Sequence, residues 1–213
     1  MSSYTSFLSA KVNFDDTSEA ELNKLINVEL TAAYTCASMA CFFAKDKVAL
    51  PGLEHYFKEA KMERLKVVKA ILKYMKVRGG NIKFSPINAP QEWNSTNEII
   101  NTAYEIEKHV CNKYLELIRH AHEKHDPQLH DFVQTVLLRR QQENVRELTE
   151  MIASLKKTGN DGLGLFVFDR DVAERLKMEP HKKRPDIPER EDFQSEEFES
   201  KRFKDIINAV LRP

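Results

Sequence analysis

Four apolar stripes with helical spacing run through this sequence, and each is interrupted near its middle by a polar side chain. Glu29 and Glu107 interrupt the first and third stripes, Arg64 the second, and Gln141 with its neighbour Asn144 the fourth. An unpaired buried charge costs several kcal/mol, so these interruptions must find partners. Four of them at similar heights predict one shared cluster in the interior.

Two carboxylates inside a helical bundle could serve as metal ligands. A di-iron centre in such a bundle needs several carboxylates and a Glu-x-x-His pair, whose spacing places both ligands on one helical face. The second stripe instead reads Arg64-Leu-Lys-Val67. A guanidinium cannot ligate a cation, keeps its proton in proteins, and suits the bridging of carboxylates. We therefore expect a buried ion network around Arg64, with a working metal centre as the alternative.

Four long helices must position these residues. The first begins at a capping-box signature, Thr17-Ser18-Glu19-Ala20-Glu21, and ends near Lys45. The second begins at Pro51 and stops at Gly79. Ser95 or Thr96 caps the third, whose apolar stripe includes Tyr114, and the fourth runs from Asp126-Pro127 to Gly159. Short first and third connections with one long middle loop predict an all-α fold, a four-helix bundle with a single long crossover.

The chain continues beyond this bundle. Gly162 to Leu176 predicts a short fifth helix, and a Pro-rich charged linker and an amphipathic helix at about 193–211 follow it. The expected organisation is an N-terminal arm over 1–16, a bundle with its fifth helix over 17–176, and a C-terminal extension over 177–213.

Charge and composition narrow the classes of partner. Lys+Arg and Asp+Glu cancel at 33 each, so no overall field favours nucleic acid or a membrane. The apolar runs are short and the first residues lack a secretory pattern, so we expect a cytoplasmic protein without a membrane span. Cys36, Cys41 and Cys111 form an odd set without CxxC spacing, which favours small buried hydrophobic residues over a disulfide framework.

A series of short motifs over about residues 12–176 resembles ferritin, in the same order and almost without gaps. These motifs are Ile26-Asn-Val-Glu29, Tyr56-Phe57, Arg78-Gly-Gly80, Trp93, Glu107-Lys108, Asp126-Pro127, Asp131-Phe132 and Phe168-Asp169. The resemblance implies a hollow shell of 24 subunits with octahedral symmetry, in which the fifth helix lines the four-fold axes.

The same resemblance assigns roles to the interrupting residues. Glu29, Glu107 and Gln141 fall on ferroxidase positions of ferritin heavy chains, and Glu63 falls beside the position of the bridging glutamate. Arg64 stands at the position of the bridging glutamate itself. Val67 stands at the position of the metal-binding histidine, and Cys36 at the position of the catalytic tyrosine. Light-chain ferritins likewise replace the bridging acid by a base. The resemblance thus implies a vestigial ferroxidase cluster (Glu29, Glu63, Arg64, Glu107, Gln141 and Asn144), no catalytic residue, no ferroxidase activity and no required cofactor.

Two further sites follow from the resemblance. Of four positions at which light chains carry mineral-nucleating acids, Glu59 and Glu63 are acidic, whereas Met62 and Lys66 are not. At the three-fold pore, Asp131 matches a pore acid and its partner has become Gln134, so we expect weaker iron uptake.

Histidines gather near the same three-fold axis. They are His120, His122, His125 and His130. Three-fold repetition could make a metal-binding ring of His122 or His130, and the alternative is solvated histidines at a helix junction.

The 37 residues after Leu176 resemble the extension of artemin, a dormancy-associated relative of ferritin. Val167-Phe-Asp-Arg170 and Pro185-Asp-Ile-Pro188 carry this likeness, which implies an extension that fills the lumen. His181-Lys-Lys-Arg184 could contact RNA phosphates, although the glutamates that follow also fit a solvated linker.

These features favour a non-catalytic, artemin-like protective shell of 24 identical subunits, acting as a chaperone or RNA-associated stress protein. The alternative is an iron-storage subunit of light-chain type that mixes with active ferritin subunits and holds ferric iron. An active ferroxidase is disfavoured by Arg64, Val67 and Cys36 together.

Overall fold

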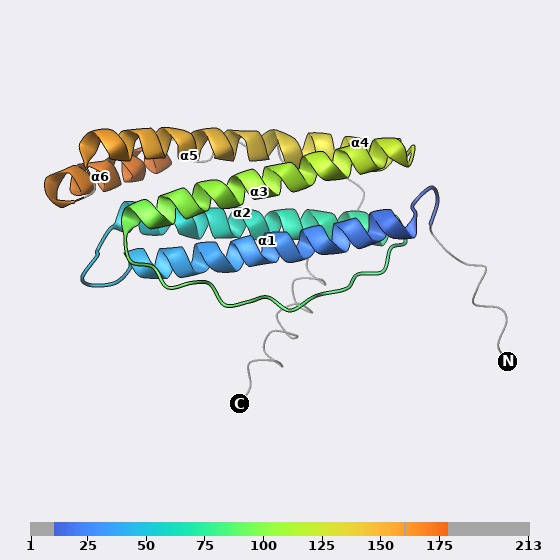
Figure 1. Cartoon of the computed structure of the whole chain (residues 1–213), viewed down its shortest axis with the longest axis horizontal. Helices are drawn as coiled ribbons and strands as arrows, with labels where there is room; N and C mark the ends of the chain where they lie inside the picture. Colours follow the sequence, from blue (N-terminus) through green and yellow to red (C-terminus); the bar gives the residue numbers. More distant parts are fainter. Residues whose placement is uncertain (1–10, 160, 179–213) are drawn as a thin grey trace, which may run out of the picture. The chain divides into compact units, whose positions relative to one another are not determined.

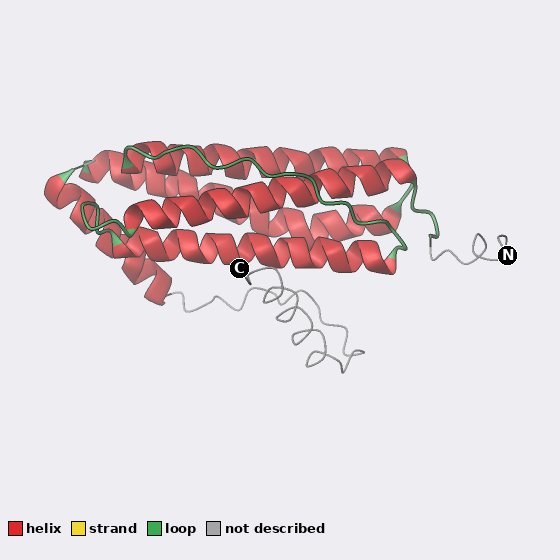
Figure 2. Cartoon of the chain, turned by 90° about the horizontal axis from the view of Figure 1, so that it is seen from below, coloured by secondary structure: helices red, strands yellow, loops and turns green. Residues whose placement is uncertain are grey.

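The computed structural model describes residues 11–159 and 161–178, and the described chain is built of helices with no strand. In chain order the helices are α1 (Asp16–Phe43), α2 (Pro51–Val77), α3 (Thr96–Glu123), α4 (Pro127–Phe132), η1 (Val133–Leu138), α5 (Arg139–Thr158) and α6 (Gly162–Met178). The loop from α2 to α3 runs along the whole length of the bundle (Figures 1 and 2). The predicted all-α bundle with one long crossover is therefore confirmed, and the expected C-terminal linker and helix lie outside the described residues.

The predicted fourth helix is not a regular α-helix throughout. Its first and last parts are α4 and α5, and η1 between them is a π-helical segment. Phe132 and Arg139, which flank this segment, both keep right-handed helical dihedrals, so the rod continues without a break. The apolar periodicity gave no sign of this segment, because one π turn adds only about one residue to the helix.

The start of α1 differs from the predicted capping box. Asp15 is the N-cap, and its Oδ1 accepts a hydrogen bond from the Ser18 backbone N–H at 2.7 Å. Glu21, which stands three residues after Ser18 in the predicted box, instead forms an ion pair with Lys24 at 2.7 Å. Of the two residues predicted to cap α3, Ser95 does so, because its hydroxyl accepts from Glu98 N–H. Asp126 caps α4, because its carboxylate accepts from Leu129 N–H.

The bundle has two apolar cores, one toward each end. One contains Phe43, Phe57, Ile100, Leu148 and Phe168, and the other contains Leu22, Ile71, Val110, Leu129 and Val133. On each of the four rods, the interrupting polar residue lies in the stretch between the two cores. The sequence interruptions therefore form a polar layer across the middle of the bundle.

Helix α6 is attached through the first turn of α2. Asp169 accepts hydrogen bonds from the backbone N–H groups of Gly52 at 3.1 Å and Leu53 at 2.8 Å. These N–H groups lack partners within their own helix, so Asp169 caps α2 from another element. A Cβ on Gly52 would lie 2.2 Å from the Asp169 carbonyl oxygen, so this close approach requires glycine.

Helix α1 is long and apolar enough, by length and composition alone, to cross a membrane, contrary to the sequence expectation. Half of its most apolar stretch is buried within the bundle, as is usual for a core helix.

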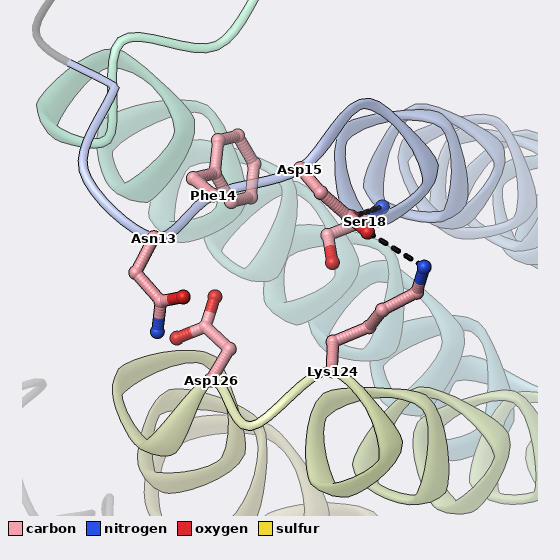
Figure 3. Close-up of a pocket in the computed structure, with 6 residues that line it drawn as sticks. All are labelled: Asn13, Phe14, Asp15, Ser18, Lys124 and Asp126. Carbon is pink, nitrogen blue, oxygen red and sulfur yellow. Dashed lines mark hydrogen bonds and ion pairs between the residues drawn. The ribbon is translucent and has the colours of Figure 1, made fainter.

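Two ion pairs hold the end of the bundle where α1 begins and α3 ends, and Figure 3 shows the one between Asp15 and Lys124. Arg78 donates to both carboxylate oxygens of Asp126, at 3.2 and 2.8 Å, and to the Asn13 carbonyl at 2.6 Å. Lys124 pairs with the Asp15 carboxylate at 2.9 Å, so the helix cap is tied to the turn after α3. A cavity of about 180 Å³ lies between these groups.

The Asp15 cap predicts a pH-dependent contribution to stability. Burial favours the protonated acid, but hydrogen bonds from Lys124 and Ser18 outweigh it and hold the pKa of Asp15 below its ordinary value. This contribution is therefore present above about pH 4 and is lost as the pH falls below it. We expect Asp15→Ala to lower the free energy of unfolding by about 1 kcal/mol at pH 7.

Guanidinium unfolding at fixed subunit concentration measures this difference. Asp16→Ala is the matched control, because the neighbouring Asp16 side chain is 94% exposed and does not cap the helix. An equal loss in both variants at pH 7, or a difference that does not shrink as the pH is lowered from 7 to 2, would contradict the prediction.

Candidate functional site

Arg64 occupies the centre of the polar layer and reaches residues from the three other rods. Its Nη1 donates to Glu29 Oε2 at 3.1 Å and to Gln141 Oε1 at 3.0 Å, and its Nη2 forms an ion pair with Glu107 Oε2. Only 3% of Arg64 is exposed, and Glu29 is fully buried. The guanidinium therefore lies between the two carboxylates that were candidates for metal ligands.

Two amide side chains complete the cluster around Glu107. Gln141 Nε2 donates to the Glu107 carbonyl at 2.7 Å and to Glu107 Oε2 at 2.6 Å, while its own oxygen accepts from Arg64. Asn144 Nδ2 lies 3.5 Å from the same carboxylate oxygen. Gln141 is thus a neutral link that pairs with an acid at one end and a base at the other.

Tyr114 is the member of the cluster that sequence reasoning missed. Its hydroxyl donates to Glu29 Oε1, so both oxygens of Glu29 are engaged, one by Tyr114 and one by Arg64. The stripe pattern treats Tyr114 as a core residue, and it is indeed 1% exposed. A signal was present: Tyr114 stands two turns after Glu107 on the same face, and a buried tyrosine hydroxyl usually finds a partner.

The electrostatics favour a charged Arg64. Burial lowers its pKa, but the Glu29 and Glu107 charges outweigh this and keep the pKa well above its ordinary value. Burial raises the pKa of Glu29, and Arg64 opposes that rise. Two carboxylates and one guanidinium leave about one negative charge in excess, which the Tyr114 hydroxyl and the amides solvate.

Neither substituted ligand position offers a useful donor. Val67 has no donor atom. Cys36 is buried, and burial raises the pKa of its thiol to about 12, so it stays protonated at neutral pH. Across the described part of the chain, no group of three or more His, Cys, Asp or Glu side chains is arranged to hold a metal ion.

Glu63 lies outside the cluster to which it was assigned. Both of its carboxylate oxygens accept from Arg140 Nη2, at 3.3 and 3.2 Å, so it forms an ion pair along the α2–α5 seam. Adjacent helix positions differ by about 100° in direction, so Glu63 and Arg64 cannot both face the layer. Of the other nucleation positions, Glu59 is half-buried, and Met62 and Lys66 are exposed.

The predicted pore residues lie near the α3–α4 junction. His122, Asp131 and Gln134 are exposed, and His130 is half-buried. His120 instead faces α1, where its Nε2 lies 3.1 Å from the Ser18 hydroxyl. One subunit thus presents single side chains at this junction, and a ring would need copies of the chain.

A four-helix bundle with one long crossover and a polar layer that contains two acids is typical of a ferritin-like protein. The chain matches the ferritin-like domain over residues 19–158 and belongs to the ferritin family. It is 36% identical to a soma ferritin of Lymnaea stagnalis over 165 residues, which are 76% of this chain and 94% of that protein. It is 35% identical over 162 residues to a ferritin middle subunit of Aquarana catesbeiana (74% and 92%), and 33% identical over 157 residues to a ferritin of Pacifastacus leniusculus (73% and 87%).

Arg64 is expected to be a large contributor to stability because its removal leaves two buried acids without a cation. Arg64→Met should lower the free energy of unfolding by about 3–5 kcal/mol at pH 7. The loss should shrink in acid, because burial raises the pKa of Glu29 and protonation of that acid removes uncompensated negative charge. Chemical denaturation at pH 7 and pH 4.5 measures both effects.

Arg64→Met with Glu29→Gln and Glu107→Gln is the matched control and should recover much of the stability. A small loss in the single variant, or no recovery in the triple variant, would show that the ion network is not what holds this layer.

Proposed function

We propose that this protein is a non-oxidising, iron-storing ferritin subunit of light-chain type. The observation that carries the proposal is the Arg64 guanidinium, which occupies the space between Glu29 and Glu107. The ferritin names of the relatives favour storage over the protective shell that the sequence suggested first. Iron is then cargo, and the subunit needs no resident cofactor.

The contacts of the cluster support an inactive centre. Glu29 uses one oxygen for Tyr114 and the other for Arg64, so binding of iron there would have to break existing hydrogen bonds. A second cation beside the permanently charged Arg64 would also be repelled. The layer instead holds the four rods together, and oxidation would fall to partner subunits with an intact centre.

An apolar face on α6 supports assembly. Leu163, Phe166 and Val167 lie on one face of this helix and are 76, 55 and 47% exposed in the single chain. Large apolar residues grouped in this way mark an interaction site. We infer that copies of α6 cover this face in a 24-subunit cage, as a homo-oligomer or with other ferritin subunits, in the cytoplasm and without a membrane.

The protective shell remains a second candidate, because the surface of α2 is poorly suited to nucleating mineral. Glu63 is paired with Arg140, and Met62 and Lys66 replace acids at two nucleation positions. In that case RNA or client proteins would be the partners, and the artemin-like extension would contribute.

Iron loading tests the proposal. Fe(II) mixed aerobically with the purified protein should oxidise at the rate of the protein-free solution, because the centre lacks a bridging acid and a histidine. In shells that also contain oxidising ferritin subunits, the iron retained per particle should grow with added Fe(II). Rapid oxidation by the protein alone would refute the inactive centre, and mixed particles without iron would favour the protective shell.

Arg64→Glu with Val67→His supplies the positive control for this assay. It should raise the initial oxidation rate roughly tenfold or more, equivalent to about 1.4 kcal/mol of barrier. Val67→His alone keeps the guanidinium and should stay at the background rate.

The α6 face predicts a defect in assembly. Phe166→Glu would place a charge in a buried contact and should shift the protein from large particles to smaller species in light scattering. Arg170→Glu is the matched control on the same helix, where Arg170 is 67% exposed and pairs with Glu174. Full-sized particles from Phe166→Glu would show that α6 does not mediate assembly.

A further inference from the structure

The outward face of α2 carries one sign of charge. All of its exposed charged residues in the described helix are lysines, namely Lys58, Lys66, Lys69, Lys73 and Lys76. The acids of α2 are half-buried and lie in its first half, where Glu54 pairs with Lys58 and Glu63 with Arg140. After Glu63 the helix contains basic residues and no acid.

Three of these residues form what we call the lysine row: Lys66, Lys69 and Lys73. Their spacings of three and four residues place them on one side of the helix. No salt bridge within the described residues involves any of the three, unlike Lys58 on the same helix. The row spans roughly 10 Å along the axis at about 1.5 Å per residue.

The positive charge of the lysine row contrasts with the balanced charge of the whole chain. The whole sequence is balanced at 33 basic and 33 acidic residues, so the row is a local field and not part of a generally basic protein. Each ammonium is a strongly hydrated point charge on a flexible stem, which suits the oxygens of phosphate groups without fixed geometry.

The side chains beside the row identify the kind of anion. Nucleic acids bound as single strands usually stack their bases on aromatic side chains. The aromatic residues of α2 point away from the row: Phe57 is buried, Tyr56 is half-buried, and Tyr74 is stacked on Phe132 with ring centroids 4.2 Å apart. The exposed neighbours are aliphatic, Met62 and Leu65. The surface offers charge without a stacking platform.

We propose that the lysine row of α2 binds inorganic polyphosphate, a linear polyanion that carries no bases. This activity uses neither the Arg64 cluster nor oxidation of iron, and one member of the row, Lys66, stands at a nucleation position that has lost its acid. A chain of phosphates can contact successive lysines along the row, and the released counterions make binding depend on salt.

Isothermal titration of the full-length protein with medium-chain polyphosphate tests the proposal. Two preparations of the protein are used. The first is the protein as purified, and the second is refolded from guanidinium with polyphosphate present, so that polyphosphate also reaches faces that assembly encloses. We expect saturable binding that weakens with added salt. Lys66→Gln/Lys69→Gln/Lys73→Gln should weaken it roughly tenfold, since each exposed ion pair contributes only modestly. Absence of binding in both preparations would overturn the proposal.

Two matched variants separate the row from general charge. Lys47→Gln/Lys83→Gln/Lys156→Gln removes the same charge from exposed positions elsewhere and should bind like the natural chain. Replacing the three row lysines by arginine should retain binding, and circular dichroism verifies the fold of each variant. Equal weakening in the two glutamine variants, or tighter binding of an RNA of equal charge, would overturn the proposal.

Discussion

The salt bridge of one buried guanidinium with two buried carboxylates is the constraint around which this bundle is arranged. Arg64, Glu29 and Glu107 come from three different helices, and each would be costly without the others. A slide of α2 by one turn, about 5.4 Å, would separate Arg64 from both acids, and a slide of α1 or α3 would leave one of the acids without its cation. The layer therefore specifies how the helices are aligned along the bundle axis. The two apolar cores are less selective for this alignment than the layer is.

The contacts of the layer also support the proposal of an inactive centre. Both carboxylate oxygens of Glu29 are engaged, by Tyr114 and Arg64, and Oε2 of Glu107 is engaged by Arg64 and Gln141. The bundle thus keeps the two acids in its central layer, and side chains of the same chain pair with them. This is consistent with a subunit that contributes a wall and a surface to an assembly and leaves oxidation to other subunits.

Much of this arrangement could be read from the sequence, because a polar residue in an apolar stripe is conspicuous and helical periodicity fixes which way it points. Arg64, Glu29, Glu107 and Gln141 were recognisable for that reason. Tyr114 was not, since a tyrosine is apolar enough to pass as core, and Glu63 was misplaced because its neighbour already filled the inward direction. The Asp15 cap depends on its tie to Lys124, which is distant in sequence.

The π-helical segment Val133–Leu138 has a geometric consequence for the last rod. One additional residue in a turn rotates everything after it by about 100° relative to an unbroken α-helix. The buried residues Leu129, Val133, Leu137 and Gln141 follow one another every four residues across this segment. A spacing of four residues exceeds one α-helical turn, so in an unbroken α-helix these side chains would drift around the rod, and the wider turn keeps them on the side that faces the interior.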